Sequence, residues 1–463
     1  MSTRIEHDFL GELSIPNDVY YGVQTYRALE NFYLSHNKIG NFPEFIIAFA
    51  YVKKAAAMAN RELGLISEEI FKGICGACDE LIAGKLHDQF PTDCIQGGAG
   101  TSVNMNANEV IANRALELMG HKKGEYKYCH PNDHVNCSQS TNDAYPTALH
   151  LALHALVKRL IKATDYLYEG FLSKGDEFRD VVKMGRTQLQ DAVPMTLGME
   201  FTAYATTLEV EMHRLDYAAK SLLEVNMGAT AIGTGICSPA GYAELCVKKL
   251  KEVSGLDVQL SSNLIEATWD TGVYVQVSAA IKSAAVKLSK ICNDLRLLSS
   301  GPRCGFNEIN LPQMQPGSSI MPGKVNPVIP EVVNQVCFDV MGKDMTVTLA
   351  SEAGQLELNV MEPIIALSLF LGVNSLRRAM HTLRDKCVNG ITANRDVCRS
   401  LVENSIGIVT ALMPHIGYEA SASVAREALE KHASVYDLVL ERKLLTKERL
   451  DELLSPEQML QPS

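Results

Sequence analysis

One polar stretch of the chain, residues 317–327, combines side chains that could transfer a proton and bind an anion. It reads Gly-Ser-Ser-Ile-Met-Pro-Gly-Lys-Val-Asn-Pro, and its two glycines and two prolines predict a loop rather than a helix. A candidate proton acceptor, a fixed cation and an amide are carried by Ser318, Ser319, Lys324 and Asn326. The loop is not a phosphate-binding motif, because the spacing between its glycines is too long and Val follows the Lys. On composition alone, a solvated turn is the alternative.

Two further loops could bind the carboxylates or the amine of a small ligand. The glycine-rich segment 97–100 leads into Thr101 and a helical pattern, so an anion could bind at the helix N-terminus. A flexible connector is equally compatible with those glycines. Ser140, Thr141 and Asn142 are neighbours that can donate to a carboxylate or accept from an ammonium. Ser140 or Asn142 could also cap the following helix, and both roles can coexist.

A fourth loop is expected over residues 185–194, where a glycine and a proline bracket Thr187 and Gln188. A fifth loop, residues 228–241, contains a Gly-Thr-Gly segment and should support the same site. Each of these loops lies between segments with a helical pattern. A bundle of helices could therefore bring several loops together at helix ends.

Three long apolar seams indicate the elements that position these loops. Their members alternate spacings of four and three: Leu149, Leu153, Leu156, Leu160, Ala163 and Leu167; Phe201, Ala205, Leu208, Met212, Leu215, Ala219 and Leu222; Val277, Ile281, Ala284, Leu288, Ile291, Leu295 and Leu298. Heptad spacing of this length predicts long helices packed at shallow angles. Additional apolar residues widen each seam, which favours an oligomer whose bundles merge.

Other segments of the chain carry weaker signals of secondary structure. We expect an irregular entry over residues 1–40, helices over 42–85 with Ser67 as an N-cap, a kink at Pro363, short helices over 395–463 and a capping box at Ser455–Gln458.

Composition narrows the class of protein. A chain of 463 residues should form two or three domains, and its formal charge of −11 argues against nucleic acid or an anionic membrane as the main partner. Residues 1–13 lack the apolar run of a signal peptide, and the most apolar stretch, 360–373, is too short to span a membrane. Twelve cysteines then indicate reduced thiols in the cytoplasm. Cys75 and Cys78 lie in a helical pattern, where two buried side chains are favoured over a redox motif.

The segment G-S-S-I-M-P-G-K-V-N-P resembles the signature loop of the aspartase/fumarase superfamily of lyases, and the resemblance extends over nearly the whole chain. It implies an all-α, three-domain fold with a central long-helix bundle. The implied boundaries are an N-terminal helical domain at 1–140, the bundle at 141–395 and a small C-terminal helical domain at 396–463. The resemblance also implies a homotetramer in which loops from three subunits form each site.

The implied reaction is the reversible elimination of ammonia from L-aspartate to give fumarate, through an aci-carboxylate intermediate. By this resemblance Ser318 is the general base. The implied substrate contacts are Thr101, Ser140, Thr141 and Ser319 to the β-carboxylate, Thr187, Lys324 and Asn326 to the α-carboxylate, and Asn142 and Gln188 to the ammonium. No cofactor is expected, although a divalent cation such as Mg²⁺ could act as an activator.

Loop sequences such as G-G-A-G-T-S-V-N-M-N resemble the aspartase branch more than the fumarase branch of the superfamily. Gln188 stands where fumarases and some aspartases have His, and an amide cannot share a proton with Glu331 as that His does. The sequence therefore favours ammonia over water as the group released. Two alternatives stay open: a fumarate hydratase acting on malate, and a non-catalytic helical scaffold.

Overall fold

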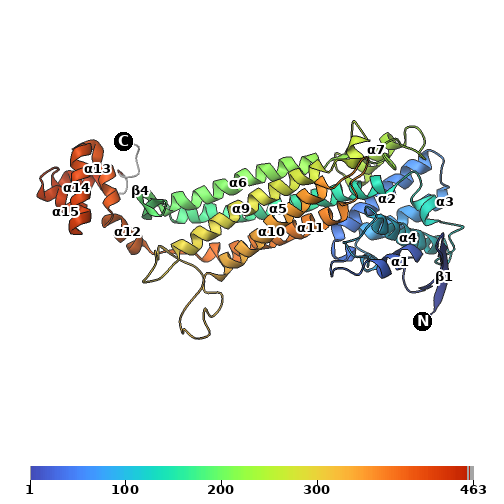
Figure 1. Cartoon of the computed structure of the whole chain (residues 1–463), viewed down its shortest axis with the longest axis horizontal. Coiled ribbons are helices and arrows are strands. Elements are labelled where there is room, and N and C mark those ends of the chain that lie inside the picture. The colour runs from blue at the N-terminus through green and yellow to red at the C-terminus, as the bar shows by residue number, and fades with distance from the viewer. Residues whose placement is uncertain (1, 456–457, 459–463) are drawn as a thin grey trace. The chain divides into compact units, whose positions relative to one another are not determined.

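The computed structural model describes residues 2–455 and 458, and they form a mainly helical protein, as predicted (Figure 1). Contacts divide the chain into two compact units. Unit 1 contains Met1–Lys162, His213–Ala285 and Phe338–Arg377, and unit 2 contains Ala163–Met212, Val286–Cys337 and Arg378–Ser463. The three-domain boundaries expected from the sequence stay a prediction. Within the described part of the chain, no helix is both long and apolar enough to cross a membrane.

Five long helices dominate the fold, and each contributes residues to both units: α5 (Thr141–Glu177), α6 (Leu197–Ser221), α9 (Gly272–Leu298), α10 (Val328–Glu352) and α11 (Glu362–Lys386). The three predicted seams lie on α5, α6 and α9, apart from Leu222, which directly follows α6, so these helices are confirmed. The predicted kink at Pro363 is wrong, because α11 begins one residue before it. Proline is tolerated in the first turn of a helix, where its missing N–H would have had no intrahelical partner.

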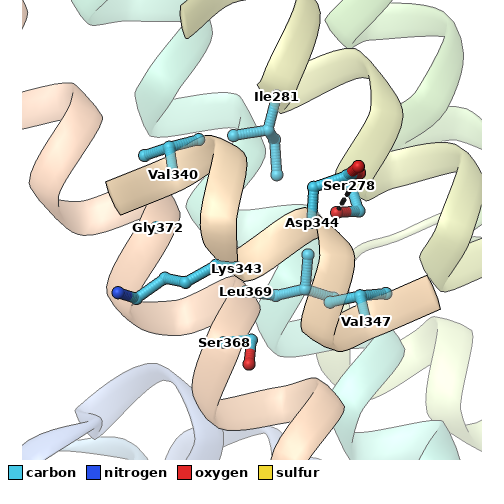
Figure 2. Close-up of a pocket in the computed structure, with 9 residues that line it drawn as sticks. All are labelled: Ser278, Ile281, Val340, Lys343, Asp344, Val347, Ser368, Leu369 and Gly372. Carbon is cyan, nitrogen blue, oxygen red and sulfur yellow. Dashed lines mark hydrogen bonds between the residues drawn. The ribbon is translucent and has the colours of Figure 1, made fainter. Parts of the chain in front are cut away.

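Within unit 1, buried aromatic and polar contacts join the long helices. Tyr274 of α9 donates to the buried Glu362 carboxylate of α11 at 3.4 Å, and its ring meets His150 of α5 edge-on. Figure 2 shows a cavity lined from α9, α10 and α11, in which Ser278 donates to Asp344 at 2.8 Å. Its volume of about 10 Å³ leaves room for one water molecule at most. None of the predicted site residues lines this cavity.

Unit 1 also contains shorter elements: β1 (Thr3–Asp8), β2 (Gly11–Pro16), α1 (Val23–Asn31), α2 (Pro43–Glu62), α3 (Glu68–Ile82), α4 (Thr101–Leu118), β5 (Glu224–Val225), α7 (Tyr242–Ser254), β6 (Gln259–Leu260) and α8 (Glu266–Trp269). Ser67 caps α3 as predicted, and its Oγ accepts from the Ile70 N–H at 3.3 Å. Cys75 and Cys78 lie on α3, where Cys78 is fully buried and Cys75 partly buried.

The irregular entry expected over residues 1–40 is wrong. β1 and β2 pair antiparallel, and α1 follows them. The N-cap residue of α1, Gly22, has no side chain to cap the helix, and the Glu6 carboxylate of β1 accepts from the Val23 N–H at 3.0 Å. The buried carboxylate of Glu109, on α4, accepts from the backbone N–H groups of Gly22, Gln24 and Thr25 at 2.8, 2.8 and 3.1 Å. A helix start that depends on a residue so distant in sequence gives no local capping signal.

Unit 2 contains β3 (Val182–Thr187), β4 (Gln190–Thr196), β7 (Ile309–Asn310), β8 (Thr392–Ala393), α12 (Arg395–Glu403), α13 (Val409–Ile416), α14 (Tyr418–Lys431), α15 (Val435–Glu441) and α16 (Lys447–Leu453). The short helices predicted after residue 395 are confirmed, and their buried apolar side chains form a cluster that also includes Met184 of β3. At the predicted capping box, the Gln458 N–H donates to Ser455 Oγ at 3.4 Å. Residues 456 and 457 of that box lie outside the described residues.

Candidate active site

Thr101 is the first residue of α4 and follows the tight turn of the glycine-rich segment. Its Oγ1 donates to the Gly98 carbonyl at 2.7 Å, and the side chain is exposed. Gly100 has φ 86° and packs against the Tyr145 ring so closely that an added Cβ would lie 2.2 Å from a ring carbon. Only glycine combines this conformation with such an approach. The glycine-rich segment is therefore a tight turn with a defined conformation that places Thr101 at the start of α4, rather than a flexible connector.

The start of α5 presents Ser140, Thr141 and Asn142. Ser140 Oγ accepts from the Asn142 N–H at 3.2 Å, so the capping role considered for Ser140 is confirmed. Asn142 Nδ2 donates to the Ala231 carbonyl at 2.7 Å, and this leaves its Oδ1 to accept from another group. Asn226 Nδ2 donates to the Asn142 carbonyl at 3.0 Å. The side-chain amide and the backbone carbonyl of Asn142 thus both form hydrogen bonds with the segment 226–231.

The buried carboxylate of Asp143 connects the Ser140–Asn142 segment with the segment 226–231. Asp143 accepts from the backbone N–H groups of Ser140, Gly228 and Thr230 at 2.9, 3.1 and 3.0 Å. Burial raises the pKa of Asp143 to about 6, although these three hydrogen bonds oppose the shift. These contacts attach the 228–241 loop to the Ser140–Asn142 segment, and the support of a substrate site by this loop stays a prediction.

Thr187 and Gln188 lie at the tip of a β-hairpin, so the loop predicted over residues 185–194 is wrong in this respect. β3 and β4 pair antiparallel with Thr187 opposite Gln190, and Gln188 and Leu189 form the turn with φ of 54° and 62°. Two left-handed residues give the turn that matches the twist of a two-residue hairpin. Thr187 and Gln188 are both exposed there.

A buried ion cluster anchors the base of this hairpin. The fully buried carboxylate of Glu308 lies 2.9 Å from Lys183 Nζ and 2.6 Å from a terminal nitrogen of Arg186. Lys183 also pairs with Glu200, and the Arg186 guanidinium stacks over the Phe306 ring at 4.1 Å. Removing one partner would leave a buried charge uncompensated, so the cluster holds the strand that ends in Thr187.

Residues 317–327 lie between β7 and α10 and form neither helix nor strand, as predicted. Ser318 Oγ accepts from the backbone N–H groups of Ile320 and Met321 at 3.2 and 3.0 Å. Asn326 Nδ2 donates to the Gly317 carbonyl. The backbone of Gly317 approaches that of Lys324 so closely that an added Cβ would lie 2.0 Å from the Lys324 oxygen. The loop thus closes on itself and brings its two ends together.

These contacts suit Ser318 to accept a proton. Two N–H groups that point at an oxygen stabilise it when it is negatively charged, so they favour the alkoxide over the neutral hydroxyl. Ser318 is half-buried, while Ser319 and Lys324 are exposed. The same two hydrogen bonds also make Ser318 a good turn residue, so geometry alone is compatible with both roles.

The structure describes the predicted site residues as two groups. Thr101, Ser140, Thr141 and Asn142 belong to unit 1; Thr187, Gln188, Ser318, Ser319, Lys324 and Asn326 belong to unit 2. Within unit 1, Thr101 lies at the N-terminus of α4 and the Ser140–Asn142 segment lies at the N-terminus of α5. These two helix starts contact each other. Among the described residues, no group of three or more His, Cys, Asp or Glu side chains could hold a metal ion.

Comparison with protein families decides the class. Residues 11–342 match a lyase family, and residues 408–461 match the C-terminal domain of fumarase C. The chain belongs to the aspartase/fumarase superfamily of lyases. The family resemblance expected from the 317–327 loop is confirmed.

Relatives and solved structures of this superfamily match along the full length. The chain is 61% identical over 459 residues to aspartate ammonia-lyase of Helicobacter pylori strain J99, covering 99% of this chain and 98% of the relative. It is 58% identical over 461 residues to that of Escherichia coli K12, covering 99% and 96%. A class II fumarase structure from Schistosoma mansoni matches with a TM-score of 0.94 at 35% identity, covering 99% of each chain. A fumarate lyase:delta crystallin structure from Brucella melitensis, bound to cobalt, matches with a TM-score of 0.97 at 52% identity over 100% of each chain.

Sequence reasoning in this lyase missed the buried polar residues beneath the Ser140–Asn142 segment. Asp143 and Asn226 were overlooked because they adjoin the segments without carrying a motif of their own. Lys53, on α2, is fully buried, and burial lowers its pKa to about 7. A lysine among alanines normally indicates an exposed helix face, so its burial had no local signal.

Proposed function

We propose that this lyase is an aspartate ammonia-lyase, which releases ammonia from L-aspartate and forms fumarate reversibly. The observation that carries the proposal is the identity of 58–61% over at least 99% of the chain with relatives of that name. Incubation with L-aspartate, with fumarate and ammonia measured together, tests it.

In the proposed mechanism, Ser318 removes a proton from Cβ of aspartate. The electron pair of that C–H bond moves onto the neighbouring carboxylate and gives an aci-carboxylate dianion. The pair then forms the Cα–Cβ double bond as the Cα–N bond breaks and ammonia leaves with the nitrogen pair. The extra charge of the dianion needs preorganised donors, and one such donor is typically worth about 3 kcal/mol.

The proposed donors and contacts follow the superfamily. The β-carboxylate would be held by Thr101, Ser140, Thr141 and Ser319, the α-carboxylate by Thr187, Lys324 and Asn326, and the ammonium by Asn142 and Gln188. To donate to the carboxylate, the Thr101 hydroxyl would first leave the Gly98 carbonyl. Two local features support the roles of Ser318 and Asn142. Two N–H groups already point at Ser318 Oγ, and Asn142 has its amide nitrogen engaged, so that its oxygen is left to accept from an ammonium.

The proposal includes a homotetramer whose sites combine loops from three subunits. The two groups of site residues then need not come from one chain. Supporting this, α10 carries a row of exposed apolar side chains, Phe338, Met345 and Leu349, which are 58%, 60% and 61% exposed. Their spacing of seven and four places them on one helix face, and an apolar face this exposed favours burial against another helix.

The proposal includes neither a cofactor nor a resident metal, and a divalent cation such as Mg²⁺ would act only as an activator. A cytoplasmic location is also proposed. All twelve cysteines lie among the described residues and all are free, as suits a reducing compartment.

Fumarate hydratase is the second candidate, because a class II fumarase shares the fold at 35% identity. Gln188 distinguishes the two, since an amide cannot activate water with Glu331 by sharing a proton. We expect Gln188→His not to create an efficient hydratase, because the other loops keep aspartase-type residues. Rates of fumarate hydration and amination by the variant and the parent check this. Hydration by the variant as fast as amination by the parent would show that this single position sets specificity.

A further inference from the structure

Near the start of α5, the half-buried amide of Asn136 links α2 with α4 and, through Asn104, reaches one of the proposed substrate contacts. Asn136 Oδ1 accepts from Lys53 Nζ at 3.0 Å, from Asn104 Nδ2 at 3.1 Å and from Asn108 Nδ2 at 3.1 Å. The Asn104 amide also donates to Thr141 Oγ1 at 3.1 Å. Asn104 and Asn108 are 1% and 0% exposed, so water does not compete for these contacts.

The orientation of every amide in this network is fixed by one carbonyl. Asn136 Nδ2 donates to the Gln139 backbone oxygen at 3.2 Å, and a carbonyl oxygen can only accept. The other terminal atom of Asn136 is therefore its oxygen, and the groups around it must be donors. Asn104 consequently directs its NH₂ group toward both Asn136 and Thr141.

This arrangement sets the direction of the Thr141 hydroxyl. Because Oγ1 already receives a hydrogen bond from Asn104, its own proton must point elsewhere. No acceptor for that proton is found among the described residues, and Thr141 is 9% exposed at the start of α5. The Oδ1 atom of Asn104 is buried and has no hydrogen-bond partner in the described part of the chain, which costs free energy. The hydrogen bonds of the Asn104 side chain are therefore the two that its NH₂ group donates.

We propose that Asn104 is a positioning residue for the elimination reaction: it holds Thr141 Oγ1 so that the hydroxyl donates to the substrate carboxylate. The inference rests on the proposed function, in which Thr141 contacts the β-carboxylate. The negative charge on that carboxylate grows in the transition state, so a misdirected donor lowers kcat more than it raises KM.

Asn108 provides a matched control. It lies one turn further along α4, is equally buried and donates to the same Asn136 oxygen at the same distance, but it does not contact Thr141. In the intact enzyme, we expect Asn104→Leu to lower kcat for L-aspartate about tenfold more than Asn108→Leu, with KM changed only a few-fold in both. Equal losses in the two variants would reduce Asn104 to a packing role and overturn the proposal. Should the Leu variants fail to assemble, Asn104→Ser and Asn108→Ser make the same comparison.

A double-mutant cycle with Thr141→Val tests the route of the effect. Without the hydroxyl, Asn104→Leu should cost no more than Asn108→Leu. An excess loss that persists in the Thr141→Val background would overturn the proposal, because Asn104 would then act through another group. If Thr141→Val leaves aspartate turnover unchanged, Thr141 is not a substrate contact and the inference fails while the lyase activity stands. A parent enzyme without activity on aspartate would overturn the proposed function itself.

Discussion

Ser318→Ala should lower kcat for L-aspartate by about 10²–10⁴, which is the usual share of a positioned proton acceptor. The KM should change little, because the proposed carboxylate contacts come from other residues. Oligomeric state and Tm should stay close to those of the parent, since Ser318 lies in a half-exposed loop. Steady-state kinetics with purified variants, together with thermal melting, measure all three quantities.

Ser254→Ala is the matched control for this substitution. Ser254 Oγ accepts from the Leu256 N–H at 3.2 Å, a turn contact of the same kind as those of Ser318, at the end of α7. If Ser318 were only a turn residue, both variants would keep activity within a few-fold. Exchange of the Cβ hydrogen of recovered aspartate with D₂O gives a second check, wherever the parent shows such exchange. Exchange at the parent's rate in Ser318→Ala would mean that another group takes the proton.

Lys324→Ala should weaken the use of aspartate through the loss of a charge-assisted contact to a carboxylate. Such a contact is worth about 1.5–3 kcal/mol, so kcat/KM should fall by roughly 10- to 150-fold, mainly through KM. No other residue of the loop 317–327 is a cation, so none can replace the charge of Lys324 at the carboxylate.

Arg303→Ala is the control for the loss of positive charge. Arg303 is an exposed cation in the same segment between α9 and α10, and it has no proposed contact with substrate. Its removal should leave kcat/KM within about twofold at moderate ionic strength, because long-range effects of exposed charges are screened. Equal effects of the two substitutions would assign Lys324 to general electrostatic attraction, and unchanged kinetics in Lys324→Ala would remove it from the site.

The parts of the fold that could be predicted from the sequence are those with local signals. The seams of α5, α6 and α9 come from spacing along one helix face, and the Ser67 cap needs only its own neighbours. The start of α1 depends on Glu109, more than eighty positions away, and left no such signal. The hairpin turn was missed for a related reason, because Gln188 and Leu189 adopt left-handed conformations that usually require Gly or Asn.

The candidate site divides in the same way. The residues proposed to contact substrate stand in loops with distinctive composition, so motif and resemblance could suggest them from the sequence. The residues that orient those loops are polar side chains such as Asp143, which is buried, and Asn136, which is half-buried, and their partners are distant in sequence. Burial of a polar group is a property of the folded chain, and only the structure reveals which donors and acceptors compensate it.

Release of fumarate and ammonia from L-aspartate tests the central claim most directly. The purified enzyme is incubated with L-aspartate and, separately, with L-malate, while fumarate is followed by its absorbance and ammonia by a coupled assay. We predict equimolar fumarate and ammonia from aspartate, with fumarate formation from malate slower by orders of magnitude. Fumarate from malate at a comparable or greater rate, or no product from aspartate, would contradict the account.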